Sequence, residues 1–288
     1  MRRSRYVAAP KVTAPTPLQM EPLLWLAQFG VLSTPQLVRL IGRYEKGVQR
    51  SMRAVFDAGL VEVIPIPRAA LAPPGTPEDH RLLFGSAPNV YRLSKTGVKY
   101  LAGEGIAEPI TPPTIGVKNT LFAAHELQVR DFLVWLVESC RLYRLEVLRT
   151  SVDRPVLGEA MPDALFIVKL TQGRLVGLVE CDRGTERGVS RWQNKARSYA
   201  QMFASGALQE ATGGLRNARI LVTTPSITRR NQLAGLIREL SPELASQYWL
   251  TTVDTLERPG FTEPVWIRAT GGEALALVPP DRVEARTP

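Results

Sequence analysis

Two apolar runs separated by a short polar turn are the feature that most constrains the fold of this chain. Residues 164–170 and 175–181 are each long enough for a β-strand. Between them, Gln172 is followed by Gly173, which can adopt the positive φ of a two-residue hairpin loop. The runs therefore predict a β-hairpin. Its middle residues are apolar on both faces, which is typical of a sheet covered on both sides.

Acidic residues border the two runs at one end of the predicted hairpin. Asp163 precedes the first run, and Glu180 and Asp182 lie at the end of the second. A two-residue loop places Asp163 opposite Asp182, with Glu180 diagonal on the same face. Crowded carboxylates raise one another's pKa unless a cation lies between them. The pattern predicts a Mg²⁺ or Mn²⁺ site able to act on a phosphodiester. Taken singly, each acid is equally explained as a strand-end charge in solvent.

The helix predicted for residues 189–205 offers a basic group beside these acids. Trp192 and Tyr199 belong to its apolar stripe, and Lys195 lies next to that stripe. A lysine at this position could reach the sheet end and stabilise phosphate charge. The alternative is a surface lysine whose stem covers apolar neighbours.

A long amphipathic helix predicted for residues 119–140 opens this part of the chain and contains His125 and Glu126. Glu126 is a candidate fourth metal ligand, or else one half of a salt bridge on the helix surface. His125 is a candidate catalytic group, or else a histidine at the core boundary. Further strands are predicted at 142–148, 218–223 and 248–253, and a helix at 229–240. This order describes a mixed sheet flanked by helices.

The first hundred residues show a different pattern. Helices are predicted at 18–29, 35–41 and 44–58, followed by a strand at 60–66, a Pro-rich loop at 67–88, a strand at 89–94 and a helix at 95–102. Three short helices followed by two strands and a long loop is the order of a winged helix-turn-helix domain.

The third of these helices predicts a DNA-binding surface. Its apolar residues occupy one side, and long basic or amide side chains occupy the other. The candidate DNA contacts are Arg43, Lys46, Gln49, Arg50, Arg53 and, in the long loop, Arg81. Residues 1–60 hold nine Lys or Arg against three Asp or Glu, within a chain of net charge +9, which favours a double-stranded DNA partner. A solvated helix face with solubilising charge is the alternative.

Cysteine usage and hydropathy indicate where the protein acts. Cys140 and Cys181 lie in apolar contexts without metal-like spacing, as expected for buried thiols in a reducing compartment, and a zinc site is not expected. Neither a secretory signal nor a membrane partner is expected, so the predicted location is the cytoplasm. The predicted organisation is a winged-helix domain at 1–104, a linker at 105–118, an α/β domain at 119–270 and a tail at 271–288.

The motif of Pro162 and Asp163 followed by Glu180-x-Asp182 resembles the PD-(D/E)XK nuclease superfamily, the fold of many restriction endonucleases. The resemblance implies an α/β (α+β) fold, in which a winged helix is followed by a restriction-endonuclease-like mixed-sheet domain. Asp182 occupies the position where the superfamily has a lysine. Some members carry that lysine on the next helix, where Lys195 would be its equivalent.

A narrower likeness covers most of the chain. The winged helix, His125-Glu126-Leu127, the paired acids, and the run from Glu180 to Glu186 (Glu-Cys-Asp-Arg-Gly-Thr-Glu) resemble the replication-relaxation family of plasmids and integrated elements. This family is similar to mobilisation relaxases that nick DNA with a divalent metal. The resemblance implies that Asp163 and Glu180 are metal ligands, Asp182 a ligand or water orienter, and Lys195 a phosphate stabiliser. The residues implied to support them are Arg183, Thr185, Glu186, His125 and Tyr199.

Three functions remain open at this level. The first is a DNA nickase or relaxase-like endonuclease whose winged helix finds the site. The second is a replication factor or transcriptional regulator that keeps a nuclease fold without activity. The third is a recombination or defence endonuclease that makes double-strand cuts, with a homodimer as its working form. Other proteins of the mobile element are further candidate partners.

Overall fold

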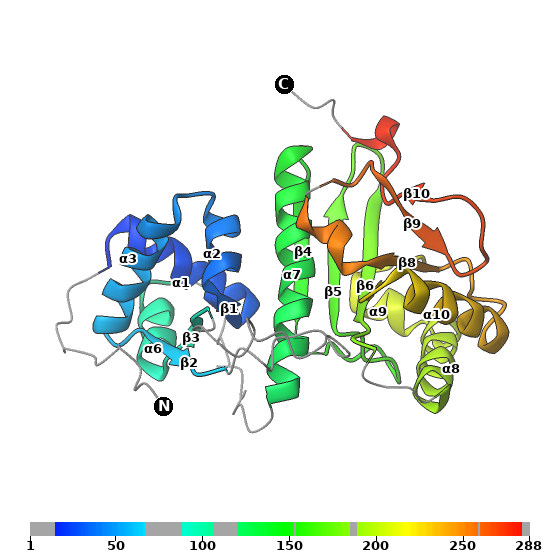
Figure 1. Ribbon diagram of the computed structural model, residues 1–288, viewed down its shortest axis with the longest axis horizontal. Helices are drawn as coiled ribbons and strands as arrows, with labels where there is room; N and C mark the ends of the chain where they lie inside the picture. Colours follow the sequence, from blue (N-terminus) through cyan, green and yellow to red (C-terminus); the bar gives the residue numbers. More distant parts are fainter. Residues whose placement is uncertain are drawn as a thin grey trace. The chain divides into compact units, whose positions relative to one another are not determined.

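The computed structural model describes residues 15–66, 88–105, 120–152, 154–184, 189–258 and 260–283. These residues form a mixed α/β structure with one three-stranded and one seven-stranded sheet (Figure 1). The chain divides into two compact units, Met1–Val134 and Trp135–Pro288. The division falls within helix α7 (Thr120–Leu142), whereas the sequence analysis placed a linker at 105–118. Residues 106–118 of that linker lie outside the described part of the chain.

The first unit begins with three helices, α1 (Pro17–Phe29), α2 (Thr34–Ile41) and α3 (Glu45–Asp57). Helix α2 starts at Ser33, whose side chain accepts a hydrogen bond from the Gln36 amide, and ends at Gly42, whose φ of 66° suits glycine. The predicted helices are confirmed to within one residue at each end. Strand β1 (Val31–Ser33) was not predicted, because three residues between two helices carry no periodic pattern.

A small antiparallel sheet completes this unit. Strand β3 (Val90–Leu93) lies between β1 and β2 (Val61–Ile64), and α6 (Lys95–Gly103) follows it. The predicted order of helices and strands is thus confirmed. Residues 67–87 of the long loop, with Arg81, lie outside the described residues. Gln36 of α2 donates hydrogen bonds to the Leu127 carbonyl and the Asp131 carboxylate, so the first half of α7 belongs to this unit.

The second unit is built on the seven-stranded sheet, whose order is β10-β9-β8-β7-β6-β5-β4. Strands β6, β7 and β8 are parallel, and the other pairs are antiparallel. The strands are β4 (Glu146–Val152), β5 (Ala164–Lys169), β6 (Arg174–Cys181), β7 (Arg219–Thr224), β8 (Tyr248–Thr252), β9 (Pro264–Arg268) and β10 (Leu275–Ala276). The strand predicted at 142–148 begins only at Glu146, because α7 continues to Leu142.

Helices cover both faces of this sheet. On one face lie α8 (Val189–Ser205), α9 (Ala207–Thr212) and α10 (Ile227–Leu240), which share one apolar cluster with the strands (Figure 1). On the other face, Trp135 of α7 contacts the rings of Phe261 and Trp266. Residues 271–283, expected as a tail, include β10, which pairs with β9, and the buried side chains of Leu277 and Val278.

The predicted β5–β6 hairpin is present, but its predicted register is wrong by two residues. Lys169 pairs with Arg174, and the Leu170 amide donates to the Gly173 carbonyl. The two central residues of the loop are therefore Thr171 and Gln172, and Gly173 follows them with a φ of 84°. A shift of two residues keeps every side chain on its predicted face. It changes only which residues lie opposite one another.

Candidate functional site

The new register brings Asp163 beside Glu180 at the edge of the sheet where β6 ends. The Asp163 amide donates to the Val179 carbonyl (2.9 Å), and its Oδ2 accepts a hydrogen bond from the Cys181 amide (2.8 Å). Asp163 is therefore bound to the residues on both sides of Glu180. The prediction that Asp163 faces Asp182 is wrong, because the loop closes one residue earlier than expected.

Helix α8 supplies both remaining partners of Glu180. The Lys195 ammonium group contacts Oε2 of Glu180, and the Tyr199 hydroxyl donates to Oε1 over 2.7 Å. Lys195 and Tyr199 are four residues apart, so both project from the same side of the helix. The Lys195 ammonium group also lies 5.3 Å from the centre of the Trp192 ring. Trp192 is buried in the apolar cluster and holds this side of α8 on the sheet.

Burial dominates the electrostatics of Glu180, which is only 1% exposed. Loss of hydration raises the pKa of its carboxyl, while Lys195 lowers that pKa and nearby Asp163 raises it. The pKa of the Tyr199 hydroxyl is also raised well above its ordinary value, first by burial and then by the charge of Glu180. Two carboxyl groups and one ammonium group thus share a space from which water is largely removed.

A second tyrosine lies against the first. The rings of Tyr199 and Tyr248 are in edge-to-face contact, with centres 6.0 Å apart. The Tyr248 hydroxyl is buried and has no hydrogen-bond partner among the described residues. Burial and the charge of Glu180 raise its pKa. The two rings therefore extend the apolar surroundings of the acids as far as β8.

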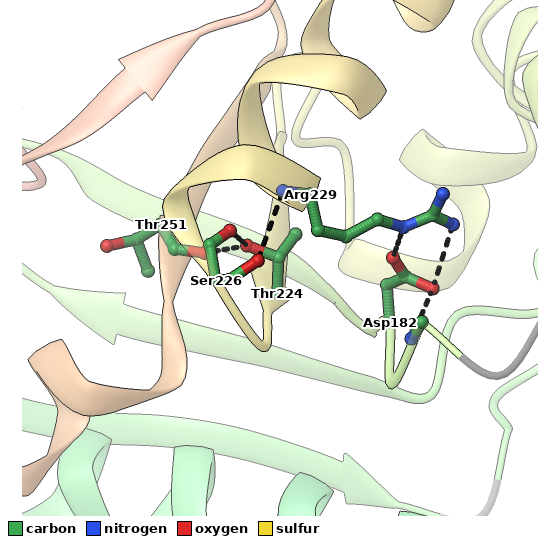
Figure 2. A network of polar contacts seen from close by, with 6 residues as sticks. Asp182, Thr224, Ser226, Arg229 and Thr251 are labelled. Carbon is green, nitrogen blue, oxygen red and sulfur yellow. Dashed lines mark hydrogen bonds and ion pairs between the residues drawn. The ribbon is translucent and has the colours of Figure 1, made fainter. Parts of the chain in front are cut away.

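Asp182 is held by a different partner. Its Oδ2 accepts a hydrogen bond from Nε of Arg229 (2.5 Å), its Oδ1 lies 3.3 Å from Nη2 of the same guanidinium, and the Gly184 amide donates to Oδ1 (3.2 Å). Figure 2 shows Arg229 extending from the first turn of α10 to this carboxylate. The ion pair balances the charge of Asp182 at the end of β6.

The start of α10 is anchored to the same edge of the sheet. The Ser226 hydroxyl accepts a hydrogen bond from the Arg229 amide and so caps the helix (Figure 2). The Thr224 hydroxyl contacts the carbonyls of Ser226 and Thr251, which joins the end of β7 to the end of β8. These bonds fix the position from which Arg229 reaches Asp182.

Of the three carboxylates at this edge, Asp163 and Glu180 are the pair that could hold a divalent cation, because Asp182 is paired with Arg229. Mg²⁺ is commonly held by one or two carboxylates, water and substrate phosphate, and Asp163 and Glu180 could provide such a pair. The described residues contain no set of three His, Cys, Asp or Glu side chains that could hold a metal ion. Glu180 would have to release Lys195 to bind a cation through Oε2.

The other candidate residues divide between the two units. In the first unit, Glu126 forms an ion pair with Arg130 on α7 (2.9 Å), but Arg130 is fully buried, so this is not the surface salt bridge that was expected. His125 is half-buried on the same helix. In the second unit, Arg183 is half-buried, and burial lowers the pKa of its guanidinium. Thr185 and Glu186 lie outside the described residues.

The candidate DNA contacts on α3 fall into two groups. Lys46 and Arg50 are exposed, and their charges face solvent. Gln49 donates to Glu45, and Arg53 forms an ion pair with Asp57 (2.8 Å). Arg43, which precedes the helix, lies 3.4 Å from the Glu21 carboxylate. Lys46 and Arg50 are therefore the residues of α3 best placed to meet a phosphate backbone.

Arg229 is the site residue that the sequence analysis missed. It lies at the start of a predicted helix, directly after a predicted strand, which brings it to the strand-end edge of a parallel sheet. This position in the predicted order of elements could have identified Arg229 as a candidate site residue. The partner of Arg229 could not be predicted, because the wrong hairpin register had placed Asp182 opposite Asp163.

Comparison with protein-family models identifies a family. The model described as replication-relaxation matches residues 23–217, which is more than half of the chain. This range includes the second half of α1, the whole of α2 and α3, the β5–β6 hairpin and α8. Searches of curated proteins and of solved structures found no match. No described helix is both long and apolar enough to cross a bilayer.

Proposed function

The chain belongs to the replication-relaxation family, and on that premise we propose that it is a DNA-binding, metal-dependent nickase of a plasmid or mobile element. Membership of the family indicates a role in plasmid replication or mobilisation. Its first unit binds double-stranded DNA as a winged helix, and its second unit, a PD-(D/E)XK-like domain, cuts one strand. The reaction takes place in the cytoplasm.

One observation carries the proposal. Asp163 and Glu180 lie side by side at the end of β6, and Lys195 of α8 contacts Glu180. Two carboxylates and a lysine at a strand end are the groups that metal-dependent phosphodiester cleavage needs. The lysine that the superfamily carries on the strand is here supplied by the following helix. This geometry supports activity more directly than the sequence pattern alone.

Each residue has a distinct part in the proposed reaction. Asp163 and Glu180 would hold the cation, which when bound supplies positive charge for the phosphodiester and lowers the pKa of a coordinated water. Lys195, displaced from Glu180, would place its ammonium group against the scissile phosphate, where negative charge develops. Tyr199 keeps the Glu180 carboxylate in one orientation through its hydrogen bond.

The first unit supports the DNA-binding half of the proposal. Three helices are followed by an antiparallel pair of strands, and α3 presents Lys46 and Arg50 to solvent. Long cationic side chains on such a helix contact phosphates and base edges in the major groove. The excess of positive charge in residues 1–60 favours approach to DNA before specific contacts form.

Incubation of the protein with supercoiled plasmid and Mn²⁺ tests the proposal. Open circles should appear with the wild type and be lost in Asp163→Asn and in Glu180→Gln, while all three proteins bind DNA equally. Asp182→Asn is the matched control, because Asp182 is held by Arg229, and it should keep activity. Intact supercoils with normal DNA binding would sink the proposal. Linear product would instead indicate double-strand cleavage by a homodimer.

A second candidate function is DNA binding without cleavage. It is favoured by the ion pair of Asp182 with Arg229 and by the contacts that occupy both oxygens of Glu180. In such a protein the Lys195 ammonium group permanently occupies the place beside Glu180 that a metal ion would take. The same plasmid experiment separates the two functions, because a non-cleaving replication factor or regulator leaves supercoils intact while it binds them.

A further inference from the structure

Three arginines gather at the edge of the large sheet opposite the acidic site. Arg219 opens β7, and Arg268 closes β9, which runs antiparallel to β8. The guanidinium carbon of Arg219 lies 4.2 Å from the centre of the Trp249 ring, and that of Arg268 lies 5.1 Å from the same centre. Both cations are held over one aromatic ring of β8.

The third arginine, Arg282, belongs to a short helical turn near the end of the described chain. Burial, together with the charges of Arg268 and Arg282, lowers the pKa of the Arg219 guanidinium to about 10. Arg219 also donates a hydrogen bond to the Leu277 carbonyl, which fixes its position. We call these three residues, Arg219, Arg268 and Arg282, the arginine cluster.

The arginine cluster has no acidic partner among the described residues, whereas several other arginines of the protein do. Arg92 pairs with Glu62, Arg130 with Glu126 and Arg229 with Asp182. Within the cluster, by contrast, the charges close to Arg219 are those of two further arginines. Gathering like charges around a partly buried guanidinium is unfavourable unless an anion completes the set.

We propose that the arginine cluster binds phosphate groups of the DNA backbone and forms a second DNA contact, in the second unit. Guanidinium groups bind phosphate oxygens through paired hydrogen bonds. Trp249 and the Leu277 carbonyl hold Arg219 in place, while Arg268 and Arg282 are exposed and can reach a ligand. The choice of DNA as the polyanion rests on the proposed function. A free phosphate or nucleotide would use the same chemistry.

Fluorescence anisotropy with a labelled duplex over a range of salt concentrations tests this assignment. In Arg268→Ala/Arg282→Ala, affinity at moderate salt should fall on the order of tenfold, and the slope of log K against log salt should decrease by about 2. The variant keeps Arg219 and should fold normally, which thermal unfolding checks. Arg268→Lys/Arg282→Lys retains both charges and should keep most of the slope.

A matched control separates the arginine cluster from total charge. Arg174→Ala/Arg197→Ala removes two exposed arginines that form no ion pair with a described residue. Arg174 lies on β6, on the opposite face of the sheet from Trp249, and Arg197 lies on α8. For this control variant, the slope of log K against log salt should stay near that of the wild type. An equal loss in both double variants would overturn the inference, because the effect would then follow net charge alone.

The source of the phosphate is tested in the same assay. Inorganic phosphate should compete with duplex DNA no better than chloride at matched ionic strength. Stronger competition by phosphate, lost in Arg268→Ala/Arg282→Ala, would assign the cluster to a free phosphate ligand and overturn the DNA assignment. Failure of the wild type to bind duplex at all would contradict the proposed function itself. Normal wild-type binding with an unchanged cluster variant contradicts only this inference.

Discussion

The Tyr199 hydroxyl of α8 donates a hydrogen bond to Oε1 of Glu180 on β6 over 2.7 Å. The other oxygen of the same carboxylate contacts Lys195, so one helix supplies both partners of a buried acid. Because the carboxylate is almost fully buried, its orientation depends on these two groups and not on water. The acidic site is thus organised by the packing of α8 on the sheet.

Tyr199→Phe should destabilise the protein by about 1–2 kcal/mol, because the Glu180 oxygen loses a hydrogen bond and cannot regain it from water. Removal of the phenolic oxygen leaves the ring and its packing in place. Urea unfolding followed by circular dichroism measures the change in the free energy of unfolding. An unchanged free energy would show that the hydrogen bond contributes nothing to stability.

Tyr248→Phe is the matched control for that variant. Its ring touches that of Tyr199, but its buried hydroxyl has no hydrogen-bond partner among the described residues. Replacing a buried, unpaired hydroxyl by hydrogen removes a desolvation cost. The same unfolding experiment should therefore show stability equal to, or greater than, that of the wild type.

Lys195→Met should destabilise the protein in a pH-dependent way. Burial raises the folded-state pKa of Glu180, so the stability that this carboxyl contributes is complete below its unfolded pKa and is lost as pH rises through the folded value. Removing Lys195 takes away an influence that lowers this pKa. The folded pKa then rises further, and the variant loses more stability than the wild type at high pH.

The size of that effect can be measured by urea unfolding with a chelator present. At about pH 8 the variant should be about 2 kcal/mol less stable than the wild type, because the buried Glu180 carboxylate has lost its ion pair with the Lys195 ammonium group. At about pH 4, where the carboxyl is protonated in both proteins, the difference should nearly vanish. A difference of constant size across this range would mean that the Lys195 contact acts through packing and not through charge.

Gly177→Ala should destabilise the sheet by about 1–3 kcal/mol through overpacking. A Cβ atom at this position of β6 would come within 2.2 Å of the Phe166 ring on the neighbouring strand. Phe166→Leu in the same chain should recover part of the loss, because the smaller side chain makes room for the methyl group. Thermal unfolding of the single and double variants measures both effects. If the losses of stability in the two single variants simply added in the double variant, a direct contact between a side chain at position 177 and the Phe166 ring would be contradicted.

The order of most elements could be predicted from the sequence, because most of the helices and strands carry their own hydrophobic period. The run from Ala164 to Lys169 and its partner β6 are clear examples. Strands β1, β9 and β10 were not predicted. A strand of two or three residues is defined by its hydrogen-bonded neighbour, and the neighbour of β1 is β3, which follows α2, α3 and β2 in the sequence.

The sequence predicted which residues of the candidate site lie near one another, but not how they pair. Asp163, Glu180 and Lys195 were chosen correctly as neighbours, because strand ends and the next helix meet at one edge of the sheet. The exact pairing depended on where Gly173 falls in the hairpin loop, and a shift of two residues replaced Asp182 by Glu180 opposite Asp163. The ion pair of Asp182 with Arg229 joins residues 47 positions apart, which no local pattern predicts.

Titration calorimetry of the metal-free protein with Mn²⁺ tests the central claim, that Asp163 and Glu180 hold a divalent cation. The account predicts one Mn²⁺ per chain, with binding lost in Asp163→Asn and in Glu180→Gln. Binding should be retained in Asp182→Asn, because that carboxylate is already paired with Arg229. Absence of Mn²⁺ binding by the wild type, or equal binding by Asp163→Asn, would contradict it.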